Sequence, residues 1–103
     1  MKLWLGVMLL SIEIHGACSL KDRRQVVHSL IGRLKRHFNA SAADLGPEGL
    51  WNLAEIGAVC SGSSSHETAS RLEEMCLCAE RSEEEGEFEI LNLQREVHAY
   101  GDL

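Results

Sequence analysis

Cysteines are the residues of this sequence with the clearest chemical potential. The 103-residue chain holds four of them, and cysteine thiols can pair as disulfides, bind zinc or stay free in a core. No C-x-x-C motif is present, and the five histidines show no metal-ligand spacing. We therefore expect disulfides, and no metal centre or cofactor. The cysteines are Cys18, Cys60, Cys76 and Cys78, and the histidines are His15, His28, His37, His66 and His98.

The pairing of these cysteines is narrowed by helix geometry. Cys76 and Cys78 would project about 200 degrees apart on a helix, so they do not pair with each other. Cys60 then pairs with one of them and Cys18 with the other. A helix beginning near His66 would place Cys76 about 15 Å along its axis, so either the loop after Cys60 is longer than the capping signal suggests or Cys60 pairs elsewhere.

Catalytic constellations are missing from the sequence. We find no nucleophile elbow, phosphate-binding loop or paired-carboxylate arrangement, and a chain of this length leaves little room for a deep pocket. The sequence therefore predicts a protein that is not an enzyme. Asn39-Ala40-Ser41 fits the N-glycosylation acceptor pattern and lies in an expected loop, so Asn39 is a candidate glycosylation site.

The N-terminal segment has the pattern of a secretory signal peptide. Lys2 precedes a ten-residue apolar run, Leu3 to Ile12, and small residues follow between His15 and Ser19. We expect residues 1–17 to be removed, with a cut as late as 19, leaving 18–103 as one secreted, extracellular domain. Cys18 lies at this boundary. Its loss would leave three cysteines and make a covalent homodimer possible.

Charge is divided unevenly along the chain, although the net formal charge is −6. Six basic residues stand against one acid between Leu20 and Phe38, whereas three arginines stand against fourteen acids from Asn39 onward. The halves can attract each other in the fold, or the basic segment can face an anionic partner. Net acidity and export argue against nucleic acid. The candidate basic contact face comprises Lys21, Arg24, Arg33, Lys35 and Arg36.

Apolar spacing predicts helices throughout the remainder. A helix is expected over Leu20–Phe38, between a capping box at Ser19 and Asn39. A second is expected over Leu50–Cys60 after a start at Gly46-Pro47, a third from Ser64-Ser65-His66-Glu67, and a fourth over Ile90–Tyr100. A brief strand around Phe88 and Ile90 is the competing interpretation of the last segment. The expected fold is all-α, a disulfide-stabilised bundle of three to four short helices with an acidic C-terminal part.

These features together favour a secreted, non-catalytic polypeptide that resembles hormones, small cytokines or venom polypeptides in size and composition. We expect its partner to be an extracellular receptor, channel or other protein. Two alternatives use the basic segment alone. Arg23-Arg24 and Lys35-Arg36 are paired basic residues that processing proteases cut, so the chain could be a precursor releasing a peptide from about Gln25 to Phe38. The same stretch could also be a membrane-active helix, in which case a membrane surface is the partner.

Overall fold

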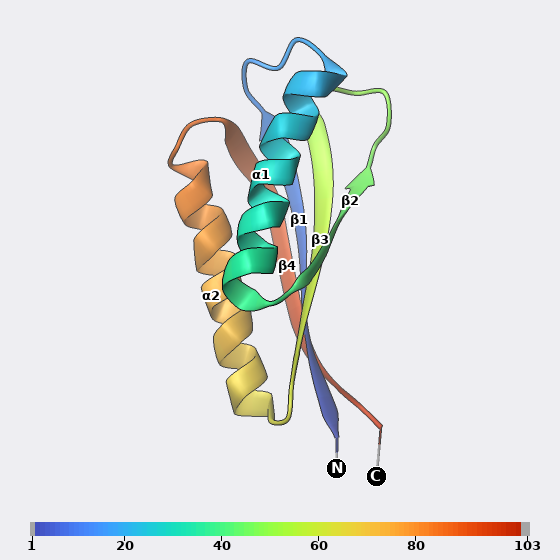
Figure 1. The fold of residues 1–103 in the computed structure, drawn as a ribbon, viewed down its shortest axis with the longest axis vertical. Coiled ribbons are helices and arrows are strands. Elements are labelled where there is room, and N and C mark those ends of the chain that lie inside the picture. The colour runs from blue at the N-terminus through green and yellow to red at the C-terminus, as the bar shows by residue number, and fades with distance from the viewer. Residues whose placement is uncertain (1, 102–103) are drawn as a thin grey trace.

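The structure is a computed structural model and describes residues 2–101. Two helices pack side by side against one face of a single sheet, and the first and last strands lie next to each other (Figure 1). The elements in chain order are β1 (Leu3–Ile14), α1 (Leu20–Phe38), β2 (Ser41–Gly46), β3 (Leu53–Gly62), α2 (Ser65–Glu83) and β4 (Phe88–Tyr100).

The sheet has four antiparallel strands in the order β2-β3-β1-β4. The first and last strands of the chain are therefore neighbours, and each helix connects two strands that are not adjacent in the sheet. This β-α-β-β-α-β arrangement is the ferredoxin-like fold, which interleaves two split βαβ units. The core lies between the sheet and the helices, and Met8, Leu10, Ile56, Leu34 and Met75 are among its fully buried side chains.

The expected all-α bundle is wrong, and the segment Leu50–Cys60 shows why. Its C-terminal part belongs to β3, in which buried Ala54, Ile56, Ala58 and Cys60 alternate with residues on the other face. Because two of those other residues, Gly57 and Val59, are also apolar or small, the segment lacks the polar alternation that marks a half-exposed strand. Gly46 is the last residue of β2 and Pro47 begins the connection to β3, so no helix starts at this pair.

The expected fourth helix is also wrong, because residues 88–100 form the edge strand β4. Ile90, Leu93 and Val97 are spaced by three and four residues, which imitates a helix. The first spacing arises where the β1–β4 register shifts between Ser11 and Ile12, which leaves one extra residue on β4. The spacing of four from Leu93 to Val97 is twice the two-residue period of a strand, with Arg95 on the same face between them. The competing strand interpretation was right in kind but too short.

The apolar run near the N-terminus forms β1, the strand that pairs with both β3 and β4. Met8, Leu10 and Ile12 face the helices and are fully buried, while Leu5, Val7 and Leu9 are half-buried on the opposite face. A central strand with apolar residues on both faces has a continuous apolar sequence, and so does the core of a signal peptide. Removal of residues 1–17 stays a prediction, and it would take away all of β1.

The helix predictions at both capping signals are confirmed. In α1 the Ser19 hydroxyl accepts a hydrogen bond from the Asp22 backbone N–H, and Asn39 ends the helix in a left-handed conformation. The Ser64 hydroxyl accepts from the Glu67 N–H in the same way at the start of α2. Both ends of α1 fall where the capping pattern placed them.

The predicted disulfides are wrong as well, since all four cysteines are free thiols. Cys60 of β3 and Cys76 of α2 are buried in the core, where a thiol packs as a small apolar group, and burial raises the pKa of both. Cys78 is half-buried, and Cys18 is exposed before α1. A hormone-like or toxin-like disulfide scaffold is therefore not what this chain forms.

Candidate functional site

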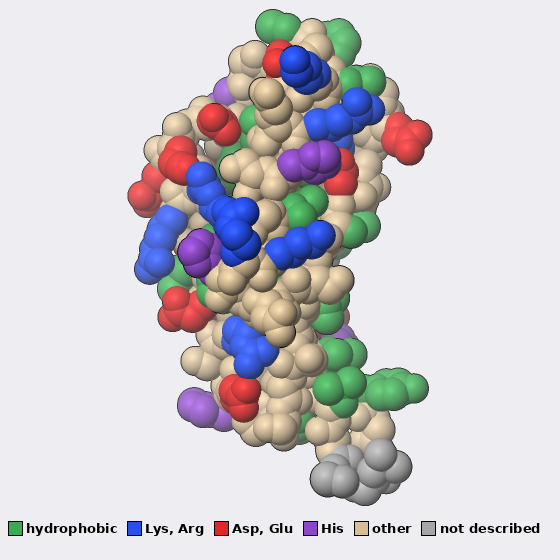
Figure 2. All heavy atoms as spheres, viewed as in Figure 1, with side chains coloured by type: hydrophobic (Ala, Val, Ile, Leu, Met, Phe, Trp, Pro, Cys, Tyr) green, Lys and Arg blue, Asp and Glu red, His purple; other side chains and the backbone are tan. Residues whose placement is uncertain are grey.

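The outer side of α1 carries a row of basic side chains. Lys21, Arg24, Lys35 and Arg36 are exposed on this side, and we call these four residues the basic stripe. Figure 2 shows Lys and Arg side chains gathered along the part of the surface formed by α1. None of the four forms an ion pair within residues 2–101. The stripe is therefore a row of charges free to contact another molecule.

Helix packing determines which side of α1 faces outward. Val27, Leu30, Ile31 and Leu34 recur at helical spacing and are buried against the sheet and α2. The opposite side is left to solvent over a helix of 19 residues, about 28 Å long. A peptide released from this segment would first have to detach that apolar face from the core.

Gly32 lies on the same side of α1 as the basic stripe, in the uncharged interval between Arg24 and Lys35. A Cβ placed on Gly32 would lie 2.9 Å from Nη1 of Arg36. The Arg36 guanidinium therefore lies back across the helix at the glycine, which brings positive charge into the space between Arg24 and Lys35. Glycine at this position lets the arginine lie flat against the helix.

Arg33, the fifth residue of the expected contact face, has a different position. Its Nη1 donates to the Ser82 hydroxyl at 2.8 Å and its Nη2 contacts the Glu85 carboxylate at 2.7 Å, so it links α1 to α2. Hydrogen bonding to Glu85 raises the pKa of Arg33. We therefore leave Arg33 out of the basic stripe.

Arg23 also points away from the stripe. Its guanidinium donates two hydrogen bonds to the Asp44 carboxylate, at 2.7 and 3.0 Å, and its Nε donates to the Leu53 carbonyl at 2.9 Å. The hydrogen bonds from Arg23 lower the pKa of Asp44. This residue ties α1 to β2 and β3, and the structure rather than the sequence separates it from Arg24.

A hollow of about 570 Å³ lies beside the N-terminal end of the stripe. Leu20, Arg23 and Arg24 line it from α1, and Asp44 to Gly49 line it from β2 and the connection that follows. Leu20 and Leu45 expose 38% and 55% of their surface there, and the same connection exposes Leu50 and Trp51. Charge and apolar surface are therefore adjacent at this end of the molecule.

Asn39 is exposed at the end of α1, where a glycan would have access. Its modification stays a prediction. No helix within residues 2–101 combines the length and the apolar character that crossing a bilayer requires.

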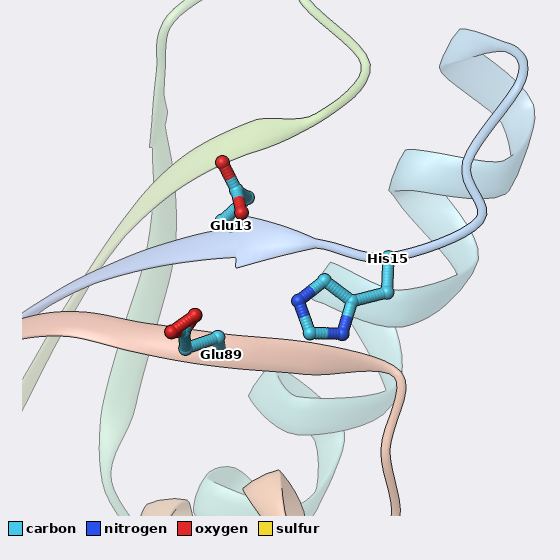
Figure 3. A group of neighbouring side chains, drawn as sticks. All are labelled: Glu13, His15 and Glu89. Atoms are coloured by element: carbon cyan, nitrogen blue, oxygen red, sulfur yellow. The ribbon is translucent and has the colours of Figure 1, made fainter.

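A second group of side chains, which the sequence reasoning missed, lies on the other face of the sheet. Glu13 of β1, His15 just after it and Glu89 of β4 bring one oxygen or nitrogen atom each within 4.8 Å of one another. Figure 3 shows the two glutamates on neighbouring strands and the imidazole ring directed back toward them. The alternation Glu13-x-His15 would place both on one face of a strand, but it becomes a signal only once residues 3–14 are recognised as a strand.

Comparison with known proteins gives a family and a fold. A family model described as "Protein of unknown function (DUF503)" matches residues 5–95. No curated protein matches the sequence.

Three solved structures resemble the chain in fold alone, since each has low sequence identity to it. The de novo designed protein Foldit4 is 8% identical, with full coverage of both chains and a TM-score of 0.50. SnoaB, a cofactor-independent oxygenase from Streptomyces nogalater, is 12% identical over 96% of this chain and 95% of its own, with a TM-score of 0.52. A VAO-type flavoprotein from Myceliophthora thermophila C1 is 13% identical, with a TM-score of 0.54 over 96% of this chain but only 17% of its own.

Proposed function

The chain belongs to the DUF503 family, whose function is unknown, and we propose that it is a non-catalytic binding module that engages the acidic surface of a partner protein through the basic stripe. The proposal rests on one observation. The chain holds sixteen acids and ten bases, yet the four cations of the stripe have no carboxylate partner within residues 2–101. Acids are abundant, so the stripe is not unpaired for lack of them.

The helix itself gives little reason for this charge. Lys35 and Arg36 in the last turn interact favourably with the negative end of the helix dipole. Lys21 lies in the first turn, near the positive end, where a cation costs a few tenths of a kcal/mol. A row of cations that extends to this unfavourable end serves contacts outside the helix.

A protein partner fits the surroundings of the stripe better than a nucleic acid does. Leu45 beside Arg24 and the exposed Leu50 and Trp51 that follow in the same connection supply apolar and aromatic surface typical of protein interfaces. The stripe carries no aromatic side chain on which a base could stack, and the chain as a whole repels polyanions. An extracellular partner is expected only if the predicted signal peptide is used.

The test measures binding to two probes of equal charge, a glutamate-rich peptide and a single-stranded RNA. We expect the peptide to bind, and to bind more weakly as salt is added, because exposed charges are screened. In a variant carrying Lys21→Gln, Arg24→Gln, Lys35→Gln and Arg36→Gln, affinity should fall about tenfold, since exposed ion pairs contribute about 0.2–1 kcal/mol each.

Arg81→Gln is the matched control, because Arg81 is exposed on α2 and also lacks an ion-pair partner within the described part of the chain. It should bind the peptide as the wild-type chain does. Equal losses in Arg81→Gln and in Arg24→Gln alone would contradict the proposal. Tighter binding of the RNA than of the peptide would replace the protein partner with a nucleic acid.

A further inference from the structure

We propose that Glu13, His15 and Glu89 form a binding site for a divalent transition-metal ion, with zinc as the best-suited ion. The site lies on the face of the sheet opposite the helices, away from the basic stripe (Figure 3). It therefore stands independently of the proposed partner surface.

Strand register brings the three ligands together. Glu13 and Glu89 are direct partners in the β1–β4 pairing, and His15 lies two residues beyond Glu13 on the same face. The backbone around the histidine is held in place, because the His15 N–H donates to the Glu87 carbonyl at 2.9 Å and the Ile14 N–H to the Asn52 carbonyl at 2.7 Å. Two of the three ligands thus lie on paired strands, and the third follows β1 directly with its backbone N–H hydrogen-bonded.

The present ligand separations are close to those of a metal site. Ligand atoms that bind zinc at about 2.1 Å lie roughly 3.4 Å apart in a tetrahedral arrangement. The donor atoms of the three residues already lie within 4.8 Å of one another. His15 and Glu89 are exposed, so small side-chain rotations can bring their donor atoms to the metal.

Charge at this position also calls for a cation. Two carboxylates directly opposite each other on neighbouring strands repel and destabilise the pairing. Glu73 on α2 pairs with Arg95 of β4, but neither Glu13 nor Glu89 forms an ion pair within residues 2–101. A bound divalent ion would convert that repulsion into a link between β1 and β4.

The donor set selects the class of ion. One imidazole nitrogen and two carboxylates suit zinc and its neighbours, whereas calcium and magnesium prefer oxygen ligands alone, and calcium needs six to eight of them. Three protein ligands leave a fourth zinc position for water or for a group from another molecule. The site is therefore of the open type.

The experiment is a zinc titration of the full chain, followed by calorimetry and by thermal unfolding. We expect one zinc ion per chain and a higher unfolding temperature with zinc present. In His15→Ala and Glu89→Gln, zinc affinity should fall by more than about tenfold, since losing even an outer hydrogen-bond partner of a metal ligand costs 10–100-fold. The zinc-dependent rise in unfolding temperature should disappear with it.

Two control variants make the result specific. His98→Ala removes another exposed histidine of the same sheet, one that contacts only Glu96, at 3.0 Å, and so offers two ligands instead of three. Cys18→Ser removes the exposed thiol, which is itself a good zinc ligand. Both should keep wild-type zinc binding. The proposal is overturned if the wild-type chain binds no zinc, if His15→Ala still binds it, or if Cys18→Ser abolishes it.

Discussion

Arg23 and Arg24 are adjacent in the sequence, but one is buried and the other is exposed. One helical step rotates the side chain by about 100 degrees, which takes Arg23 into the interface with β2 and β3 and leaves Arg24 exposed. Arg23 is 6% exposed and has both a carboxylate and a carbonyl partner. One residue of this dibasic pair is therefore buried, and proteolytic processing there would require α1 to unfold first.

Replacing Asp44 by asparagine tests the part that Arg23 plays. The variant D44N leaves a largely buried guanidinium without its charged acceptor, so we expect the free energy of unfolding to fall by about 2 kcal/mol. Urea denaturation at neutral pH measures the loss. Glu85→Gln is the control, because its ion pair with Arg33 is more exposed and should contribute less. Equal losses in the two variants would contradict the assignment.

The same ion pair predicts how stability depends on pH. Arg23 lowers the pKa of Asp44 in the folded chain, whereas in the unfolded chain the pKa of this carboxyl is about 3.9. At a pH between these two pKa values the unfolded chain binds more protons than the folded chain. The stability that the Arg23–Asp44 pair contributes is therefore fully present above a pH of about 4 and is lost as the pH falls through the folded-state pKa. Urea denaturation between pH 3 and 7 should show that the free energy of unfolding falls less on acidification in D44N than in the wild-type chain. Matching acid profiles would argue against the pair.

At the scale of elements, α2 packs closely on the middle of the sheet at Gly6 of β1. A Cβ at this glycine would lie 2.9 Å from Sγ of Cys60 and 3.3 Å from the side chains of Leu72 and Thr68. Glycine thus sets how near α2 approaches β1. The buried thiol of Cys60 is part of that close contact rather than a reserve for a disulfide.

Gly6→Ala should destabilise the chain by about 1–3 kcal/mol, because the added methyl group overpacks this contact. Combining it with Cys60→Ala should recover part of the loss, since the sulfur is the nearest of the atoms that the methyl group meets. Urea denaturation of the two single variants and the double variant measures the coupling. Simple additivity of the two single effects would show that the contact is not shared.

For the whole molecule, the central question is whether the N-terminal segment stays with the chain. β1 pairs with two strands along nearly its whole length and contributes several fully buried core residues. Without it, β4 would lose its neighbour in the sheet, and β3 would become an edge strand with one side unpaired. Export with cleavage after Ala17 and the fold described here are therefore alternatives.

A chain beginning at Cys18 should fail to form this structure. We expect the full chain to show a cooperative unfolding transition and the shortened chain to show none, because the core between sheet and helices is no longer closed. Circular dichroism during thermal unfolding distinguishes them. Intact mass of the protein from its native source shows which form exists, and a mass corresponding to 18–103 would establish the signal peptide.

The sequence by itself determined the two helices, their caps and the basic side of α1. Capping boxes and apolar spacing act over a few residues, so Ser19, Asn39 and Ser64 mark helix ends without reference to the rest of the chain. Which of the basic residues are exposed followed only in part, because the partners of Arg23 and Arg33 come from distant elements.

Only the tertiary structure decided the strands and everything that depends on their pairing. A strand is stabilised by neighbours far away in the chain, and the local pattern of β1 is also that of a signal peptide, while the extra residue in β4 imitates a helix. The meeting of Glu13 and His15 with Glu89 is a property of register alone. Spacing within one segment cannot reveal contacts that arise between the two ends of the chain.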